Sequence, residues 1–489
     1  MVPTRTNRRH FPGRLALATA LSLAQAALAL TADAASPAGP AREFTPRPTF
    51  SPASSAPDPR KPASPTKPAN RPPAPPAFAP QRACSFRVPM CVQLADGVPP
   101  WAAAEVFRAA ESALEGYRAL GLPMPLADDT RGGTPAYDLY LGATTGPAVT
   151  VADPETEPRP TDQSAAYTLF PVPSTWGCDL SFEVARHAAE AIFLRADAAA
   201  ERGMLAAASS YLASIVAPCA AVEAAAVDRF QAEPHRAITD FVSGAASPAS
   251  GNMLFPMYLE ENGASGDPGR LVTSLFAIAT QKTDPASPTW QNEPDTFDAL
   301  RSSLRFRRDS LDDLLLGFAV DRAFVGNRSD GAHLWATDLY GAAGRVFFEW
   351  SISYASLPRR LAPARPLDPT GATYLWLDLA NAPKDAEITF VADWELPAMF
   401  RWSLVKVDKN GAESGRIDVA GMVGASHAER TVIFREELAG LIIVGTFTGS
   451  LDRTLPFDPD EAPFMPHSYE VTLHGQIDSA PSPSVAPSD

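Results

Sequence analysis

The spacing of hydrophobic residues changes along the chain, from the period of an α-helix in the first half to the alternation of a β-strand in the second. Apolar residues three and four positions apart predict helices over Trp101–Leu120, Leu180–Arg195, Leu271–Gln281, Thr296–Arg307 and Ser310–Phe324. Short stretches rich in tyrosine, leucine and phenylalanine predict two strands in this half, Tyr137–Leu141 and Ala165–Phe170.

After Gly344 the pattern alternates and turn residues separate the alternating stretches. Seven strands are predicted, over Val346–Tyr354, Thr373–Leu379, Glu387–Trp394, Phe400–Asp408, Arg430–Phe434, Leu438–Phe447 and Ser468–Gly475. Because no helical spacing intervenes, they favour an antiparallel β-sandwich. Four tryptophans lie in or beside these strands, where core packing explains them better than a platform for stacking sugars: Trp350, Trp376, Trp394 and Trp402.

The predicted fold class is therefore α+β. A mostly helical domain with a small sheet is expected over residues 81–335, and the β-sandwich over residues 336–476. Residues 35–80 are dominated by proline, alanine and serine, which predicts a disordered linker, and residues 477–489 predict a disordered tail. Residues 1–34 read as a signal peptide, with a basic start, an apolar run and small residues before Ala35.

The net charge of −15 disfavours nucleic acid and anionic membrane surfaces as partners. The apolar run of the signal peptide is short for a membrane span, and no later stretch is longer. We therefore expect a protein without a membrane span that is secreted, periplasmic or at the cell surface after the signal peptide is cleaved.

The chain has four cysteines, Cys84, Cys91, Cys178 and Cys219, which allow three disulfide pairings in an exported protein. Cys84 and Cys91 are close in sequence, while Cys178 and Cys219 bracket a predicted pair of helices. We therefore expect the pairs Cys84–Cys91 and Cys178–Cys219. A zinc site made of all four cysteines is the alternative, but the sequence lacks C-x₂-C spacing.

The most specific motif lies between these last two cysteines. Residues 184–191 read V-A-R-H-A-A-E-A and residues 203–209 read G-M-L-A-A-A-S. They resemble the helix pair of zincin metallopeptidases, in which V-A-H-E-x-x-H-A is followed by W-x-E-G-x-A-T. G-L-P-x-P-L-x-D from Gly121, T-P-x-Y-D-L-Y-L from Thr134 and the apolar helix Asn252–Gly263 are also similar to secreted bacterial metallopeptidases of this type. The resemblance covers about residues 84–330.

A zincin binds zinc through two histidines one helical turn apart, a third ligand on the next helix and a glutamate base beside the first histidine. In this frame the histidine positions hold Arg186 and Glu190, the base position holds His187 and the third-ligand position holds Leu205. An arginine cannot lose its proton in a protein and so cannot bind a metal. We therefore expect no zinc and no other cofactor, and His187 and Glu190 are metal ligands only under an alternative hypothesis.

The spacing within this helix also predicts ion pairs, because Glu183, Arg186 and Glu190 are three and four residues apart. In the zincin frame the guanidinium of Arg186 would stand roughly where the metal would be. The expected role of His187 is that of a core or boundary residue.

Two further groups of residues have a simpler explanation than metal binding. Asp458, Asp460 and Glu461 offer oxygen ligands for calcium, but their loop lacks the spacing of a calcium-binding motif. Asp330 lies near His333, and turn chemistry explains this aspartate.

The sequence thus favours an exported, catalytically inactive homologue of zincin metallopeptidases that binds or scaffolds a protein or peptide partner. One alternative is an active metallohydrolase with unusual ligands. Another is a cell-surface adhesion or glycan-binding protein that acts through its β-sandwich.

Overall fold

A computed structural model describes Lys67 and residues 81–154, 159–174, 176–239, 252–263, 267–307, 310–334, 344–419, 426–434, 437–450 and 465–475. The predicted signal peptide, nearly all of the predicted linker and the predicted tail lie outside these residues. The calcium candidates Asp458, Asp460 and Glu461 also lie outside them. All described residues belong to one compact unit, Pro40–Asp489.

The first half of the chain contains a five-stranded sheet in the order β1-β2-β3-β5-β4. Its strands are β1 (Arg82–Cys84), β2 (Met90–Leu94), β3 (Tyr137–Leu141), β4 (Val149–Asp153) and β5 (Ala165–Phe170). The central strands β2, β3 and β5 run parallel, while β1 and β4 are antiparallel to their neighbours. The predictions of β3 and β5 are confirmed.

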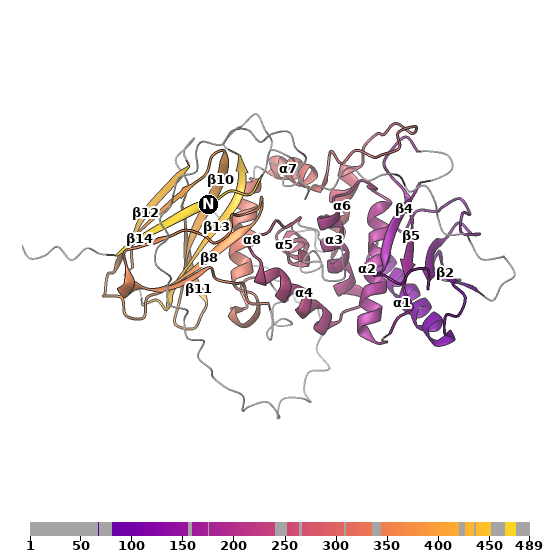
Figure 1. The fold of residues 1–489 in the computed structure, drawn as a ribbon, viewed down its shortest axis with the longest axis horizontal. Coiled ribbons are helices and arrows are strands. Elements are labelled where there is room, and N and C mark those ends of the chain that lie inside the picture. Colours follow the sequence, from indigo (N-terminus) through magenta and orange to yellow (C-terminus); the bar gives the residue numbers. More distant parts are fainter. Residues whose placement is uncertain are drawn as a thin grey trace, which may run out of the picture. The chain divides into compact units, whose positions relative to one another are not determined.

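The structure describes eight α-helices, one between β2 and β3 in the sequence and seven after β5 (Figure 1). They are α1 (Pro100–Ala119), α2 (Cys178–Leu194), α3 (Arg202–Val216), α4 (Ala220–Ala232), α5 (Leu254–Gly263), α6 (Arg270–Ala279), α7 (Thr296–Arg307) and α8 (Leu311–Ala323). Helix α2 packs against α1 and α3 and against strands β4 and β5. The predicted helices are confirmed with small shifts at their ends.

The ends of these helices follow local chemistry. Proline at the first position begins α1, and Gly121 follows the helix with a φ of 76°, a conformation that favours glycine. The hydroxyl of Ser310 accepts a hydrogen bond from the backbone N–H of Asp313 and so caps α8, as its sequence predicted.

The second half contains two sheets, in the orders β11-β10-β13-β8-β6 and β12-β9-β14-β7. Their strands are β6 (Trp350–Ser353), β7 (Arg359–Leu361), β8 (Ala372–Asp378), β9 (Glu387–Trp394), β10 (Ala398–Val407), β11 (Glu413–Val419), β12 (His427–Ile433), β13 (Gly440–Ser450) and β14 (Tyr469–Gly475). Pairing is antiparallel except between β6 and β8. The seven predicted strands are present, and the sequence did not predict β7 and β11.

Aromatic side chains join the two sheets of this half. The rings of Phe390 on β9 and Trp402 on β10 lie 5.3 Å apart, and those of Trp402 and Tyr469 on β14 lie 5.5 Å apart. Trp402 is fully buried, and the Trp394 side chain is buried as well. Core packing, rather than a sugar platform, is the role of these two tryptophans.

The helical half and the sheet half share contacts through α8, which packs on β10 and β13. The hydroxyl of Tyr374 donates a hydrogen bond of 2.8 Å to the carbonyl of Ala319 on this helix. The fold class is α+β, as predicted, with mainly antiparallel sheets in the second half, and the division into two domains near residue 335 stays a prediction. Within the described residues, no helix is both long enough and apolar enough to cross a bilayer.

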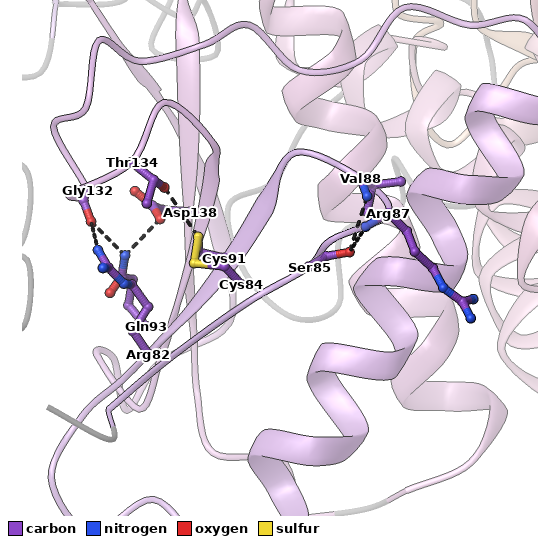
Figure 2. The surroundings of a disulfide bond; sticks show 10 residues. All are labelled: Arg82, Cys84, Ser85, Arg87, Val88, Cys91, Gln93, Gly132, Thr134 and Asp138. Carbon is purple, nitrogen blue, oxygen red and sulfur yellow. Dashed lines mark hydrogen bonds between the residues drawn. A yellow bond between two sulfur atoms is a disulfide. The ribbon is translucent and has the colours of Figure 1, made fainter. Parts of the chain in front are cut away.

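Both expected disulfides are present, Cys84–Cys91 between β1 and β2 and Cys178–Cys219 between α2 and the residue before α4. Figure 2 shows the first of them, beside the hydrogen bonds that Gln93 donates to the carbonyl of Gly132 and the carboxylate of Asp138. No cysteine is free. This excludes the four-cysteine zinc site, because a metal binds the thiolate and not the disulfide.

Candidate functional site

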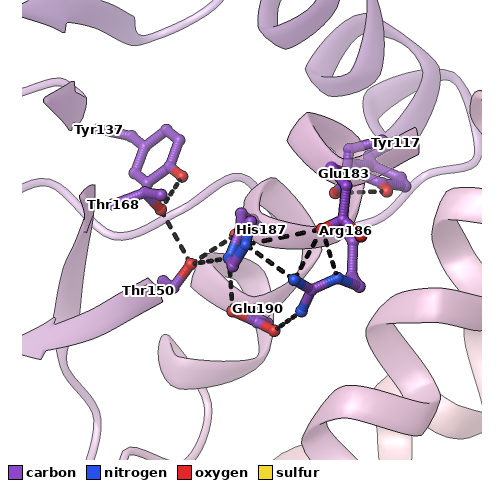
Figure 3. Close-up of polar contacts among 9 residues, drawn as sticks. Tyr117, Tyr137, Thr150, Thr168, Glu183, Arg186, His187 and Glu190 are labelled. Atoms are coloured by element: carbon purple, nitrogen blue, oxygen red, sulfur yellow. Dashed lines mark hydrogen bonds and ion pairs between the residues drawn. The ribbon is translucent and has the colours of Figure 1, made fainter. Parts of the chain in front are cut away.

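Helix α2 places the residues of the zincin-like motif beside the edge strand β4. Its apolar positions Val184, Ala188 and Ile192 are buried in the core, so the helix cannot rotate without exposing them. The hydroxyl of Tyr117 on α1 also donates a hydrogen bond of 2.9 Å to the carbonyl of Ala185. This packing fixes the direction in which the side chains of Arg186 and His187 point (Figure 3).

Arg186 is held between two carboxylates of its own helix. Its Nη1 lies 2.5 Å from Oε1 of Glu190, and its Nη2 lies 2.8 Å from Oε2 of Glu183. The side chains of Arg186 and Glu190 are only 15% and 11% exposed, whereas that of Glu183 is 44% exposed. The predicted Arg186–Glu190 pair is therefore present, and it is largely buried rather than a surface pair.

His187 is fully buried, which agrees with the core or boundary role expected from the helical pattern. Its Nε2 lies 2.8 Å from Nη2 of Arg186, and its Nδ1 lies 2.9 Å from Oε2 of Glu190. Because a guanidinium can only donate hydrogen bonds, Nε2 must act as the acceptor. The tautomer that fits these contacts is the neutral ring with its hydrogen on Nδ1, donated towards Glu190.

A chain of hydroxyl groups connects His187 to the sheet. Thr150 on β4 lies opposite Thr168 on β5, and their hydroxyl oxygens are 2.9 Å apart. Thr150 Oγ1 also lies 2.9 Å from Nδ1 of His187, and Tyr137 on β3 contacts the Thr168 hydroxyl at 2.5 Å. The network thus joins α2 to three neighbouring strands of the sheet.

The charges of this network stabilise each other. Burial raises the pKa of Glu190, but the contact with His187, the charge of Arg186 and the hydrogen bond from Thr150 outweigh it, so the pKa lies below its ordinary value of 4.5. Burial also raises the pKa of Glu183, and the charge of Arg186 again reverses the shift. Burial lowers the pKa of Arg186, but the two carboxylates raise it above its ordinary value.

The sequence could not have identified Thr150 or Thr168 as part of this site. They lie 37 and 19 positions before His187, and β4 was not predicted because its sequence, V-T-V-A-D, is short and lies close to prolines on both sides. Leu205, in the third-ligand position, is a half-buried apolar residue on α3 that packs against the core and offers no ligand atom. The arrangement holds the fixed positive charge of Arg186 between the carboxylates of Glu183 and Glu190.

Two other groups of metal-ligating residue types come together within the described residues. One is Cys178, Asp179 and Cys219, whose two sulfurs form a disulfide. The other is a set of three carboxylates, Glu293, Asp295 and Asp298, of which Asp298 forms an ion pair with Arg301. Neither set of three residues was predicted as a site. The proximity of their side chains is the only feature that would indicate a metal.

A second polar cluster surrounds His333, which is buried beyond the end of α8. Its Nδ1 lies 2.8 Å from Oδ1 of Asp330, and its Nε2 lies 2.6 Å from Oε2 of Glu413 on β11. Arg416 forms an ion pair of 2.7 Å with Glu413, and Phe324 stacks on the imidazole at 4.1 Å. The turn chemistry predicted for Asp330 is confirmed, because its Oδ1 accepts the backbone N–H of Ala332.

This cluster is electrostatically favourable only while His333 is protonated and both carboxylates are ionised. Burial lowers the pKa of His333, but the hydrogen bonds to Glu413 and Asp330 and the charge of Asp321 raise it above its ordinary value of 6.5. Burial raises the pKa of Glu413, but its bonds to His333 and Arg416 lower it to about 2, from an ordinary 4.5. The cluster therefore links the segment after α8 to β11 in a pH-dependent way.

We expect His333→Gln to remove a pH-dependent part of the stability. Because the pKa of His333 is raised, its protonated ring stabilises the fold below pH 6.5, and this stabilisation is lost as the pH rises further. Because the pKa of Glu413 is lowered, its carboxylate stabilises the fold above pH 4.5. The difference in free energy of unfolding between the native protein and the variant should be greatest between these values and shrink above pH 6.5. Denaturant unfolding at several pH values measures it, with the exposed His474→Gln as control. A difference that does not change with pH would contradict the expectation.

The comparisons with known proteins identify no family for this chain. No family model matches the sequence, and no curated protein matches it. Among solved structures, a similarity is found to DesR, a β-glucosidase from Streptomyces venezuelae in complex with D-glucose, at 15% identity and a TM-score of 0.12. It covers 24% of this chain and 10% of that one, which is too little to carry an argument about fold or function.

Proposed function

We propose that this protein is an exported homologue of zincin-type metallopeptidases that has lost metal-dependent catalysis and acts by binding or scaffolding a protein or peptide. The observation that carries the proposal is the Arg186 guanidinium, held by Glu183 and Glu190 within the helix that resembles the zinc-binding helix. The order of the elements supports the same ancestry, because α1 is followed by strands β3, β4 and β5 and then by the helix pair α2 and α3. The two disulfides suit an oxidising compartment, in agreement with export.

The contacts of α2 argue against metal binding by His187 and Glu190. Both ring nitrogens of His187 already have partners, and both oxygens of Glu190 face a cationic or hydrogen-bonding group. A divalent cation would also lie close to a guanidinium that cannot be deprotonated, and like charges in a buried site repel strongly. An active enzyme using these two ligands would first have to displace Arg186.

The sheet half completes the proposal. We interpret its two sheets as a β-sandwich, supported by the aromatic contacts between β9, β10 and β14. In a binding or scaffolding role, both the helical half and the sheet half can contribute to the surface that contacts the partner, because binding needs no catalytic group. The adhesion alternative differs in placing the binding site on the sheets alone.

We expect the purified mature protein to contain no stoichiometric zinc and to leave casein uncleaved. Elemental analysis and a protease assay in the presence of added zinc measure this. The positive control restores the ligand pattern in the same chain, through Arg186→His, His187→Glu, Glu190→His and Leu205→Glu. If the zincin frame is correct, this variant should gain one zinc per chain while remaining folded by circular dichroism.

Two outcomes would contradict the proposal in distinguishable ways. One zinc per native chain that is lost in Glu190→Ala would favour the active metallohydrolase. A folded, restored variant that binds no zinc would show that these four positions do not converge, and the zincin ancestry would lose its support while the absence of catalysis would stand.

A further inference from the structure

A cavity of about 230 Å³ lies where the segment after α4 meets the sheet half, away from the Arg186 network. Its walls come from the residues that follow α4, the segment before β6, the segment after β7, and strands β8 and β14. The residues that matter for its chemistry are His235, Phe347, Glu349, Arg365, Thr373 and Tyr469.

Backbone hydrogen bonds hold these walls in place. The N–H of Ala372 donates to the carbonyl of Pro234 at 2.8 Å, and the N–H of Asp368 donates to the carbonyl of His235 at 2.9 Å. The N–H of Glu349 donates to the carbonyl of Tyr374 at 2.8 Å. The cavity is therefore formed before any ligand arrives, which lowers the entropic cost of binding.

Donors and acceptors both line the cavity. One oxygen of Glu349 accepts the backbone N–H of Ala364 at 3.0 Å, and Nη1 of Arg365 lies 3.4 Å from Nε2 of His235. Burial and the charge of Arg365 lower the pKa of His235, so the ring is neutral at pH 7 and accepts from the guanidinium. Deeper in, the buried hydroxyl of Tyr469 contacts that of Thr373 at 2.5 Å.

Three groups of the lining are open to a ligand. The half-buried Glu349 and the exposed Arg365 line the same small cavity, and among the described residues neither forms an ion pair with the other or with a third group. Phe347 also lines it and is 53% exposed, so the face of its ring is accessible from the cavity. A ligand that presents hydroxyl groups to both charges and an apolar face to the ring would satisfy all three residues.

We propose that this cavity binds a single neutral sugar residue of a glycan. Its volume is below the 300–1,000 Å³ typical of sites for drug-sized ligands, which suits one ring. Sugar hydroxyls both donate, as Glu349 requires, and accept, as Arg365 requires, and such bonds to charged groups are stronger than neutral ones. The C–H face of a pyranose packs on an aromatic ring. The carboxylate of Glu349 would repel an anionic ligand, and the guanidinium of Arg365 would repel a cationic one.

Saturation-transfer NMR on the full mature chain tests this, with glucose, galactose, mannose and N-acetylglucosamine as probes. At least one sugar should give a signal, and titration should show it binding about tenfold more weakly to Glu349→Gln, which loses the charged acceptor but keeps an oxygen for Ala364. Phe347→Ala should weaken binding about three- to tenfold. The control is Ile433→Ala, which removes an equally exposed side chain on β12 that does not line the cavity.

Three results would overturn the proposal. The first is no signal from any of the four sugars with the folded native chain. The second is binding that is unchanged in both cavity variants, which would place the sugar elsewhere. The third is that alanine, offered as a zwitterion, binds in place of the sugars and depends on Glu349 and Arg365, which would make this an amino acid site.

Discussion

Replacing Cys178 and Cys219 together by serine is expected to lower the free energy of unfolding by about 4 kcal/mol. The two cysteines are 41 positions apart, and opening a loop of this length releases that much chain entropy in the unfolded state. The disulfide joins the first residue of α2 to the residue that precedes α4, so it closes a loop that contains α2 and α3. It therefore stabilises the part of the fold that carries the Arg186 network.

The other disulfide provides a matched control. Cys84 and Cys91 are only 7 positions apart, and the same relation gives about 2.5 kcal/mol for the double serine variant. Strands β1 and β2 are paired at this point, with Cys84 opposite Cys91, so the hydrogen bonds of the sheet hold the loop as well. Denaturant unfolding of both double variants measures the difference. A larger loss for the shorter loop would show that loop entropy does not govern these two bridges.

Local patterns in the sequence were enough to place most helices and most strands of the sheet half. Strand β9 was predicted without error, because its residues alternate strictly between the core and the outside. Helix α8 was placed by its capping Ser310 and the acidic residues that follow it. In each case the residues that decide the structure lie within one element.

Strands β1 and β2 were also missed, and three other missed strands have no such local signal. Strand β11 is a polar edge strand with Gly415 in its interior, so it lacks apolar alternation. Strand β7 has only three residues. Strand β4 is defined by its pairing with β5, which no short-range pattern reveals.

The candidate site shows the same division between local and long-range information. The spacing of Arg186 and Glu190 predicted their ion pair, because side chains four positions apart on a helix are neighbours. The burial of the pair and the contact of His187 with Thr150 depend on how the sheet is placed against α2. The sequence predicted which charges meet on the helix but not which hydroxyl groups meet them.

Replacing Arg186 by methionine is expected to cost about 3 to 5 kcal/mol of stability, because it leaves Glu190 buried without its cationic partner. The same ion pair on an open surface would contribute under about 1 kcal/mol. Methionine keeps much of the length and the apolar stem of the side chain, so the loss reports mainly the charge. The carboxylate of Glu183 is more exposed and should tolerate the change better.

A double-mutant cycle separates the pair from its surroundings. Arg186→Met, Glu190→Gln and the double variant, unfolded in denaturant, give the coupling energy directly, which should be about 3 kcal/mol. The matched control is the cycle with Arg270→Met and Asp267→Asn, a pair on the surface with side chains 69% and 59% exposed and a distance of 2.9 Å. Its coupling energy should stay under about 1 kcal/mol.

The pH adds an independent check on the same cycle. The lowered pKa of Glu190 stabilises the fold above its ordinary value of 4.5, and this stabilisation is lost as the pH falls towards 2. The coupling energy should therefore decrease over this range, while Arg186 itself keeps its charge throughout. If the buried pair couples no more strongly than the surface pair at pH 7, then this face of α2 is an ordinary solvated surface. In that case a fixed charge in place of a metal would no longer explain the motif.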